Sequence, residues 1–529
     1  MPYVVTQSCC SDASCVYACP VNCIHPTPDE PDFATAEMLY VDPAACVDCG
    51  ACATACPVDA ITSSKKLTEA QLPFVEINAA FYRQQRPRPL LARPVPAPRI
   101  DTRRGPLRVA IVGSGPSAMY AADELLTQPD VSVTVFDRLT VPYGLARFGV
   151  APDHARTRQV ARLFDVMSAQ PGFGSYLDVE VGEHISHEEL LEHFHAVIYA
   201  VGASTDRKLG IPGEGLPGNV SATDIVAWYN GHPDHAGDRV DLTHRRAVIV
   251  GNGNVALDVA RLLTTDPELL ARTDIAEHAL TALRESEIEE VVVLGRRGPA
   301  ESAFTVPEFV GLLGADVDIV VEGEIPAITP GLPFETEQKL RLLHQVADRP
   351  VGERKRIVFR YQAVPARVLG TDRVTGLEIA RTELGTDPDG RVIATPTGET
   401  ERVDAGLVLT SVGYRGVPLR GVPFDDRAGV VPNHEGRVLD GGAAFPGTYV
   451  TGWIKRGPTG FIGTNKSCAQ QTVRRLADDW NAGLLAEPRF GAREFDRLVR
   501  TRRPRVRAGG AAARLAAETG PLRRLLARI

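Results

Sequence analysis

Apolar and polar positions alternate in two different ways along this chain of 529 residues. From Leu107 onward, short apolar runs of strand length alternate with longer segments of helical period, the pattern of a parallel sheet covered by helices. Two strand–glycine turn–helix units stand out, at 108–124 and 247–263. The first 64 residues lack this alternation, and residues 81–106 are rich in Pro and Arg without a period. The pattern predicts a small first module, a linker and a large α/β region.

Length and apolar content narrow the class of protein. A chain of this length is expected to form two to four domains. No apolar run reaches the roughly 18 residues of a membrane span, and the first residues lack the basic and apolar regions of a secretory signal. No basic stripe interleaved with aromatic residues is present. We therefore expect a cytoplasmic protein, without membrane insertion and without nucleic-acid binding.

Charge is distributed unevenly. Residues 1–64 contain eight acidic residues and no Lys or Arg, whereas the whole chain has 66 acidic and 58 basic residues, so the remainder has 58 of each. All of the net charge of −8 therefore comes from the first module. Such a block is usually a solvated acidic face. The alternative is electrostatic pairing with a basic surface elsewhere.

The cysteines give the most specific local signal. Nine of the ten lie between Cys9 and Cys56. Cys46, Cys49, Cys52 and Cys56 follow the C-x₂-C-x₂-C-x₃-C-P spacing of bacterial ferredoxins, in which three thiolates bind one iron–sulfur cluster and the fourth binds the other. A tetrahedral zinc site rarely places four Cys in one run with this terminal proline. The spacing predicts iron–sulfur ligation.

The earlier cysteines form a variant of the same run. Reading from Cys9 with equal spacing gives Cys9, Asp12, Cys15 and Cys19, so an acid stands where a symmetric ferredoxin has its second thiolate. One cluster then takes Cys46, Cys49, Cys52 and Cys19. The other keeps Cys9, Cys15 and Cys56, and an open or carboxylate-ligated corner favours a [3Fe-4S] cluster or a [4Fe-4S] cluster with a labile iron. Cys10 and Cys23 are interpreted as non-ligands, although Cys10 is an alternative to Cys9. The stretch 1–62 resembles the seven-iron ferredoxins, whose Cys-Pro-Val-x-Cys-Ile stretch recurs at 19–24.

The first glycine turn has the form of a dinucleotide site. The strand from Arg108 leads into Gly113-Ser114-Gly115-Pro116-Ser-Ala118 and then an Ala-rich helix. The first Gly allows the turn, the second lets the backbone approach a pyrophosphate, and the small third residue lets the helix pack on the strand. A second strand ends at Asp137, suited to the hydroxyl pair of a ribose. Together these features favour a bound nucleotide over a structural turn.

The second turn has a different specificity signal. Gly251-Asn252-Gly253-Asn254-Val255-Ala256 follows a strand, and the next strand ends in Arg296-Arg297 instead of an acid. An acid there would repel the 2′-phosphate of NADP, whereas two guanidinium groups bind it. Because hydride carries two electrons and iron–sulfur clusters take one at a time, a flavin is needed between them. We therefore place FAD in the first site and NADP(H) in the second.

Residues 105 to about 480 resemble the adrenodoxin-reductase-like ferredoxin–NADP reductases. The resemblance rests on the two glycine turns, Pro142-Tyr-Gly-Leu145, 149–154, Arg296-Arg297-Gly and, above all, 451–466. It implies that Trp453 and the backbone of Gly460, Phe461 and Ile462 lie at FAD, with Gly460 also near the nicotinamide. His154 is either an ordinary histidine at a helix start or a residue at the flavin edge. The resemblance further implies Leu145 and Val181 as FAD contacts and Arg207, Arg296, Arg297 and Glu308 as NADP contacts. Trp453, Gly460 and His154 are thus the candidate catalytic positions.

The predicted fold class is an α+β two-cluster ferredoxin followed by an α/β reductase with Rossmann-like FAD and NADP domains. We expect the ferredoxin at 1–64, a linker at 65–104, the FAD domain at 105–205 and 412–529, and the NADP domain at 206–411. The function expected is NADPH-dependent ferredoxin reduction, with electrons passing to a downstream acceptor. Two alternatives stay open: a non-catalytic redox relay, and the NADPH-oxidising subunit of a larger complex, similar to the small subunit of glutamate synthase. That subunit carries Gly-Asp where this chain has Gly452-Trp453.

Overall fold

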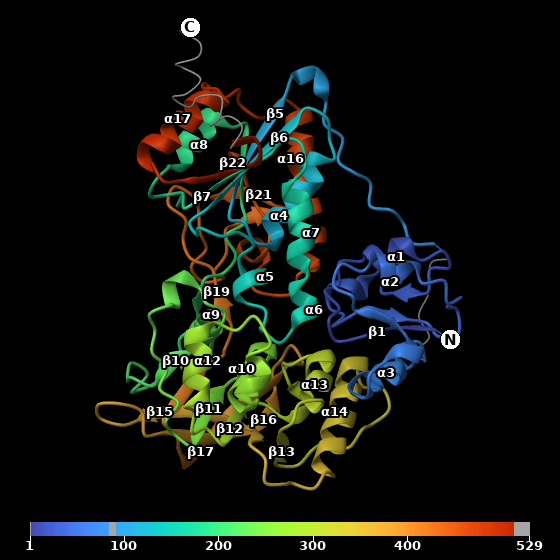
Figure 1. Ribbon diagram of the computed structural model, residues 1–529, viewed down its shortest axis with the longest axis vertical. Coiled ribbons are helices and arrows are strands. Elements are labelled where there is room, and N and C mark those ends of the chain that lie inside the picture. Colours follow the sequence, from blue (N-terminus) through green and yellow to red (C-terminus); the bar gives the residue numbers. More distant parts are fainter. Residues whose placement is uncertain (1, 84–90, 513–529) are drawn as a thin grey trace.

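The computed structural model describes residues 2–83 and 91–512. It shows a small module beside a larger part built of two α/β domains (Figure 1). Residues 2–82 form the small module, which lies next to helices of both α/β domains (Figure 1). Within the described residues, no helix has both the length and the apolar character needed to cross a bilayer.

The small module is built from two short antiparallel pairs and two short helices. Strand β1 pairs with β4, and β2 with β3. The helices α1 and α2 have five residues each and follow a left-handed residue, Ala13 or Gly50. Their C-caps, Cys19 and Cys56, have nearly the same backbone angles. The two halves therefore repeat one local design. The bounds are β1 (Tyr3–Val5), α1 (Ser14–Ala18), β2 (Ile24–His25), β3 (Tyr40–Val41), α2 (Ala51–Ala55) and β4 (Ile61–Ser63).

Helix α3 (Pro73–Phe81) also belongs to this module. Its buried face contains Phe74, Ile77 and Phe81, which pack into the core formed with β1 and β3. Asn78 ties the helix to both strands, because its carboxamide oxygen accepts from the backbone N–H of Val5 at 3.2 Å and of Val41 at 2.9 Å. The segment predicted as a linker, 65–104, thus contains a folded helix of the first module. Its Phe and Ile at helical spacing outweigh the Pro and Arg content further along.

The FAD-type domain contains an eight-stranded sheet in the order β20-β21-β22-β8-β5-β6-β7-β23. The central strands β5, β6, β7 and β8 are parallel. Every residue of β8 is buried, as expected for a strand covered on both faces. The strands are β5 (Leu107–Val112), β6 (Val131–Asp137), β7 (Phe173–Leu177), β8 (Ala196–Tyr199), β20 (Asn433–His434), β21 (Arg437–Asp440), β22 (Ala443–Val450) and β23 (Arg507–Gly509). The helices include α4 (Pro116–Leu126), α7 (Val160–Ser168), α8 (His187–His193), α16 (Thr464–Asn481) and α17 (Ala492–Arg502).

The NADP-type domain contains a six-stranded parallel sheet in the order β10-β18-β11-β12-β14-β13, extended by an antiparallel sheet of β15, β16 and β17. The six strands are β10 (Asn219–Ser221), β11 (Arg246–Val250), β12 (Glu290–Gly295), β13 (Asp318–Glu322), β14 (Arg356–Tyr361) and β18 (Leu407–Thr410). The others are β15 (Ala363–Leu369), β16 (Gly376–Thr386) and β17 (Val392–Asp404). The helices that matter below are α9 (Ala222–Tyr229), α10 (Asn254–Thr264), α13 (Val306–Leu313) and α14 (Phe334–Ala347).

The chain passes between the two α/β domains twice. The first passage follows β8, which ends at Tyr199, and the second follows β18, which ends at Thr410. The two passing segments pair with each other as β9 (Thr205–Asp206) and β19 (Tyr414–Arg415). The sheet of β5 to β8 is therefore completed by strands that follow the six-stranded domain in the chain. The predicted bounds of the FAD and NADP domains stay a prediction, and residues 513–529 of the predicted FAD domain lie outside the described residues.

Candidate active site and cluster sites

The first glycine turn joins β5 to α4. Gly113 has φ +99°, and a Cβ there would lie 2.5 Å from the carbonyl oxygen of Ala200, so only glycine fits. By contrast, a Cβ on Gly115 would meet nothing within 4 Å. Ala118 is fully buried, which lets α4 pack closely on the sheet. The turn therefore leaves open space directly in front of a helix N-terminus, which suits a pyrophosphate.

Asp137 ends β6 beside this turn. Its carboxylate accepts from the backbone N–H of Ser114 at 2.9 Å and also from the Ser114 hydroxyl. The acid predicted to bind a ribose thus lies at the glycine turn, 23 residues further along the chain. Leu145 begins α5 (Leu145–Phe148) next to Gly144, whose Cβ would lie 3.3 Å from the Cα of Gly115. Val181 packs against the core that contains the ends of β5 and β6.

The segment 452–463 lies over the start of α4. At Gly452, φ is +77° and a Cβ would lie 2.1 Å from the Ser117 hydroxyl. That hydroxyl donates to the side-chain oxygen of Asn465 at 2.8 Å, joining α4 to α16. Trp453 begins α15 (Trp453–Arg456), and its indole N–H donates to the carbonyl of Thr459 at 3.1 Å. The structure therefore brings the predicted FAD contacts Trp453, Gly460, Phe461 and Ile462 together with the first glycine turn.

The second glycine turn joins β11 to α10 with the same design. A Cβ on Gly251 would lie 2.1 Å from the carbonyl oxygen of Ser411, while one on Gly253 would meet nothing within 4 Å. Asn252 and Asn254 accept from the backbone N–H groups of Ala303 and Thr305, at 3.3 and 2.8 Å. These two amides fix the turn to the segment that leads into α13. Val255 packs, partly buried, against the core of this domain.

The arginine pair follows β12 on the same edge of the sheet. The carbonyl of Arg296 accepts from the Thr382 hydroxyl at 2.8 Å, and the carbonyl of Arg297 accepts from the N–H of Gln362 at 3.1 Å. Among the residues that the structure describes, neither guanidinium forms an ion pair. The backbone is thus fixed at the nucleotide edge, with Arg296 exposed and Arg297 half-buried. Arg207 is exposed and lies beside β9, where its N–H donates to the carbonyl of Gly413 at 3.0 Å.

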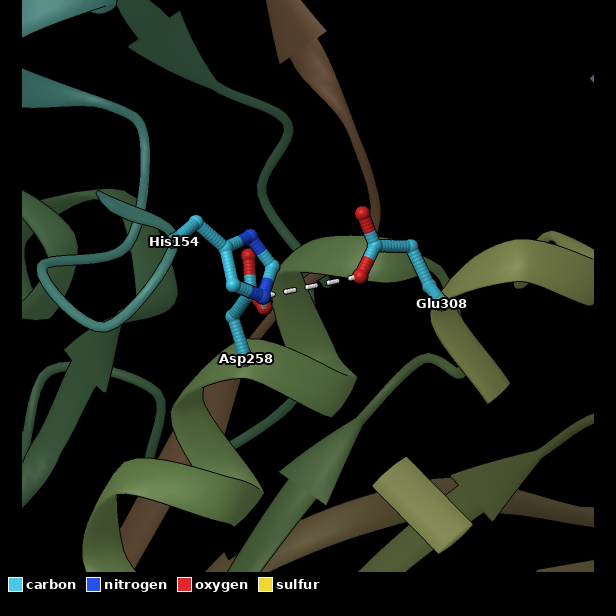
Figure 2. A group of neighbouring side chains, drawn as sticks. All are labelled: His154, Asp258 and Glu308. Carbon is cyan, nitrogen blue, oxygen red and sulfur yellow. Dashed lines mark ion pairs between the residues drawn. The ribbon is translucent and has the colours of Figure 1, made fainter. Parts of the chain in front are cut away.

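Glu308 and His154 meet between the two α/β domains. Figure 2 shows His154, directly before α6 (Ala155–Arg158), between Asp258 of α10 and Glu308 of α13; its Nε2 lies 3.7 Å from a carboxylate oxygen of each. Burial raises the pKa of Glu308, against the opposing effects of His154 and of Gln7, whose amide donates to Glu308 at 2.8 Å. Arg261 lies 2.9 Å from Asp258. The group is therefore part of an ion-pair network, in which Arg261 pairs with Asp258.

The sequence did not indicate Gln7, Asp258 or Arg261 as members of this network. Arg261 also binds Asp153 at 2.7 Å, in the motif next to His154. Asp153 belongs to the stretch 149–154 that carries the family resemblance, but the sequence does not indicate that Arg261 is its partner. Arg261 is almost completely buried, and a buried guanidinium requires paired carboxylates. An arginine inside the helix of the second nucleotide site was therefore the signal for paired carboxylates nearby.

The cysteines of the small module lie in two groups, and their assignment as cluster ligands stays a prediction. The first thiol set is Cys9, Cys15 and Cys56, with Asp12 beside all three, where its charge raises the pKa of each thiol. Burial is the larger cause and raises the pKa of Cys9 to about 11. The second thiol set is Cys19, Cys46, Cys49 and Cys52, which line one small hollow together with Cys23.

Backbone N–H groups donate to two of the sulfurs that a cluster needs. The N–H of Ala60 donates to the sulfur of Cys56 at 3.3 Å, and the N–H of Cys23 donates to that of Cys19 at 3.4 Å. Cys23, interpreted as a non-ligand, has its sulfur 3.4 Å from that of Cys19. Cys10 instead packs into the core of the FAD-type domain with Tyr120. The residues present thus fit two clusters, and the open glycine turns fit two dinucleotides.

Comparison with known proteins agrees with this arrangement. A family model described as "4Fe-4S binding domain" matches residues 39–62, and one described as "Pyridine nucleotide-disulphide oxidoreductase" matches 107–267. A probable ferredoxin/ferredoxin–NADP reductase of Mycobacterium leprae is 55% identical over 521 residues, which are 95% of this chain and 91% of that protein. The chain belongs to the ferredoxin/ferredoxin–NADP reductase family.

Two further comparisons concern the reductase part of the chain. The solved structure of Mycobacterium tuberculosis FprA in complex with NADPH superimposes with a TM-score of 0.72 at 45% identity, over 76% of this chain and 92% of that one. The mitochondrial NADPH:adrenodoxin oxidoreductase of Arabidopsis thaliana is 38% identical over 421 residues, 75% of this chain and 87% of that protein. These matches confirm the predicted resemblance and the predicted fold class: a ferredoxin module followed by a reductase with FAD- and NADP-type domains.

Proposed function

We propose that this chain is an NADPH-dependent ferredoxin–NADP(+) reductase that carries its own ferredoxin. The observation that carries the proposal is the presence, in one chain, of two open glycine turns and two separate thiol sets. When bound, FAD supplies the ability to accept a hydride from NADPH and to release single electrons, which iron–sulfur clusters take one at a time. Membership of the reductase family supports the same activity.

The chain's own residues bind and orient in this proposal. Gly113–Ala118 and Asp137 hold the diphosphate and ribose of FAD, and 453–462, Leu145 and Val181 surround its ring. Asn252–Val255 hold the diphosphate of NADPH. Arg296 and Arg297 bind its 2′-phosphate with charge-assisted hydrogen bonds, Arg207 lies nearby, and Glu308 faces His154. Hydride transfer needs stacking and orientation rather than an acid or base, so Trp453, Gly460 and His154 act by placing the two rings.

The finer cofactor assignment is part of the proposal. The second thiol set binds a [4Fe-4S] cluster. The first binds a [3Fe-4S] cluster or a [4Fe-4S] cluster, because Asp12 stands at the fourth corner and its carboxylate already accepts from the Ser14 hydroxyl. The downstream partner is a separate ferredoxin or another redox enzyme. A cytoplasmic location stays a prediction.

Anaerobic mixing of the purified protein with NADPH tests the proposal. Stopped-flow absorbance is expected to show flavin bleaching, followed by cluster reduction seen by EPR in frozen samples. Protein purified without flavin, or flavin that NADPH does not bleach, would contradict the proposed activity. If dithionite reduces the clusters but NADPH does not, electrons from NADPH reach only the flavin. The EPR signal of the oxidised protein distinguishes a [3Fe-4S] from a [4Fe-4S] first cluster.

A further inference from the structure

The ferredoxin module contacts both reductase domains through specific bonds. The N–H of Gly463 donates to the carbonyl oxygen of Cys10 at 2.7 Å. On the NADP-type domain, Gln7 donates to Glu308 at 2.8 Å, and Lys339 lies 2.7 Å from Glu37 with both side chains largely buried. Figure 1 shows the module beside α6, α13 and α14. The module is therefore held in one orientation on the reductase, so its two thiol sets have fixed and different surroundings.

The first thiol set faces the reductase. A Cβ on Gly463 would lie 2.2 Å from the backbone nitrogen of Asp12 and 2.4 Å from the carbonyl of Cys10, so the segment that carries the predicted FAD contacts touches the loop that carries Cys9. Cys9, Cys56 and Ile462 pack, partly buried, against the same core of the FAD-type domain. Phe33 and Ala34 of the module line a cavity together with Gly460, while the backbone bond to this segment comes from Cys10.

The second thiol set faces away from the reductase. Every residue that lines its hollow belongs to the ferredoxin module. Cys49 is exposed, and the side chain of the neighbouring Val47 is 59% exposed. The two sets are adjacent, since helices α1 and α2, which carry Cys15 and Cys52, pack against each other and both cysteines are buried in one core. An electron can therefore pass from one set to the other without leaving the module.

We propose that the first thiol set, Cys9, Cys15 and Cys56, receives electrons from the flavin side and that the second, Cys19, Cys46, Cys49 and Cys52, passes them to the acceptor. The inference rests on the proposed function and deepens it by giving the order. Electron transfer weakens steeply with distance, so the set against 460–463 precedes the exposed one. The reaction balances as NADPH plus two oxidised acceptors giving NADP⁺, one proton and two reduced acceptors, with two single-electron passages through the module.

A soluble dysprosium chelate tests the geometry on the unmodified holoprotein. The paramagnetic ion speeds the relaxation of EPR signals from clusters that lie near the surface. The signal of the second thiol set is recorded in dithionite-reduced protein, and that of the first set in oxidised protein for a [3Fe-4S] cluster or in reduced protein for a [4Fe-4S] cluster. We expect strong relaxation enhancement for the second set and little for the first. Equal enhancement of both signals, or a larger effect on the first, would overturn the assignment. This measurement needs no turnover and no variant.

Two ligand variants test the order. In Cys49→Ser, NADPH is expected to bleach the flavin and to reduce the first cluster as in the wild type, while reduction of cytochrome c through the module is lost. In Cys15→Ser, NADPH is expected to bleach the flavin but to leave the second cluster oxidised. EPR spectra of each variant, recorded both oxidised and after dithionite reduction, establish that it keeps its other cluster. Reduction of the second cluster at the wild-type rate in Cys15→Ser would refute the order, whereas a flavin that does not bleach in any form would refute the proposed function instead.

A matched pair of glycine variants tests the contact itself. Gly463→Ala forces 460–463 away from the Cys10–Asp12 backbone, while Gly215→Ala adds the same methyl group where nothing lies within 4 Å. Neither glycine has a left-handed φ, so neither substitution strains the backbone. We expect cluster reduction, measured relative to flavin bleaching in the same protein, to slow several-fold in Gly463→Ala and to be unchanged in Gly215→Ala. An unchanged ratio in Gly463→Ala would contradict the proposed route.

Discussion

The ion pair between Glu37 and Lys339 gives a quantitative prediction about docking. Both side chains are 11% exposed, and the Glu37 carboxylate also accepts from the N–H of Val306 at 2.5 Å. In Glu37→Ala, the Lys339 ammonium would keep only the carbonyl of Ser302, at 3.3 Å. Removing one partner of a buried pair costs about 3–5 kcal/mol. About 1.4 kcal/mol corresponds to a tenfold change in an equilibrium constant. The lower value therefore shifts the equilibrium between docked and undocked module about 150-fold toward the undocked state.

Amide hydrogen exchange at Gly463 measures this shift at a distance from the substitution. The Gly463 N–H donates to the ferredoxin module through Cys10, so it exchanges when the module leaves the reductase. We expect Glu37→Ala to speed its exchange by about 100-fold, read by mass spectrometry of the peptide that covers 460–466. The Val306 amide is unsuitable as the reporter because it loses its own acceptor in the variant.

A matched control lies on the same helix. Glu337 and Arg341 form an exposed pair on α14 at 2.6 Å, and such pairs contribute about 0.5 kcal/mol. Glu337→Ala should therefore change the exchange of Gly463 by about twofold at most. Adding Lys339→Met to Glu37→Ala removes the uncompensated charge and should recover part of the protection. If Glu37→Ala behaves like Glu337→Ala, the buried pair does not hold the module and the reasoning fails.

Three further predictions concern the nucleotide sites and the network between the domains. Arg297→Ala should raise the KM for NADPH about 10- to 100-fold and leave the KM for NADH nearly unchanged, since a charge-assisted bond to the 2′-phosphate contributes about 1.5–3 kcal/mol. Equal effects on the KM values of both cofactors would contradict this role. Gly113→Ala places a Cβ 2.5 Å from the carbonyl of Ala200, so the protein should be purified without FAD, as its absorbance at flavin wavelengths would show. Burial tends to raise the pKa of Asp153, but its bonds to Arg261 outweigh this and lower the pKa below the ordinary value. The stabilisation is therefore complete above about pH 4 and is lost as the pH falls further, so the difference in thermal stability between wild type and Asp153→Asn should narrow in acid; a constant difference would refute the pairing.

The 4Fe-4S binding domain was predictable because iron–sulfur ligation is largely a local property, while the individual ligands stay a prediction. The repeated helix geometry after Ala13 and Gly50 brings thiols of fixed spacing to the same positions in each half, so sequence distance translates directly into ligand position. The glycine turns were predictable for the same reason. At Gly113 and Gly251 the chain must come close to a neighbouring strand's carbonyl, and no other residue fits there.

Contacts between distant segments were not predictable from one sequence. Gln7 and Glu308 are 301 residues apart, and nothing in the local pattern of either relates one to the other. Helix α3 was overlooked for a different reason. The apolar spacing of Phe74, Ile77 and Phe81 was visible in the sequence, but the Pro- and Arg-rich stretch after it dominated the prediction of a linker.

Two contacts of the ferredoxin module lie on parts of the reductase that carry the predicted sites. Gln7 donates to Glu308 in the network between the domains, and Cys10 accepts from Gly463 beside the predicted FAD contacts. Other contacts only hold the module: Tyr40 and Phe81 pack edge-on against Phe334, and the carbonyl of Asp59 accepts from Arg156 at 3.2 Å. A covalent tether makes docking intramolecular, so these contacts act at a high effective concentration. In the proposed route, the contact between Cys10 and Gly463 sets where electrons enter the module.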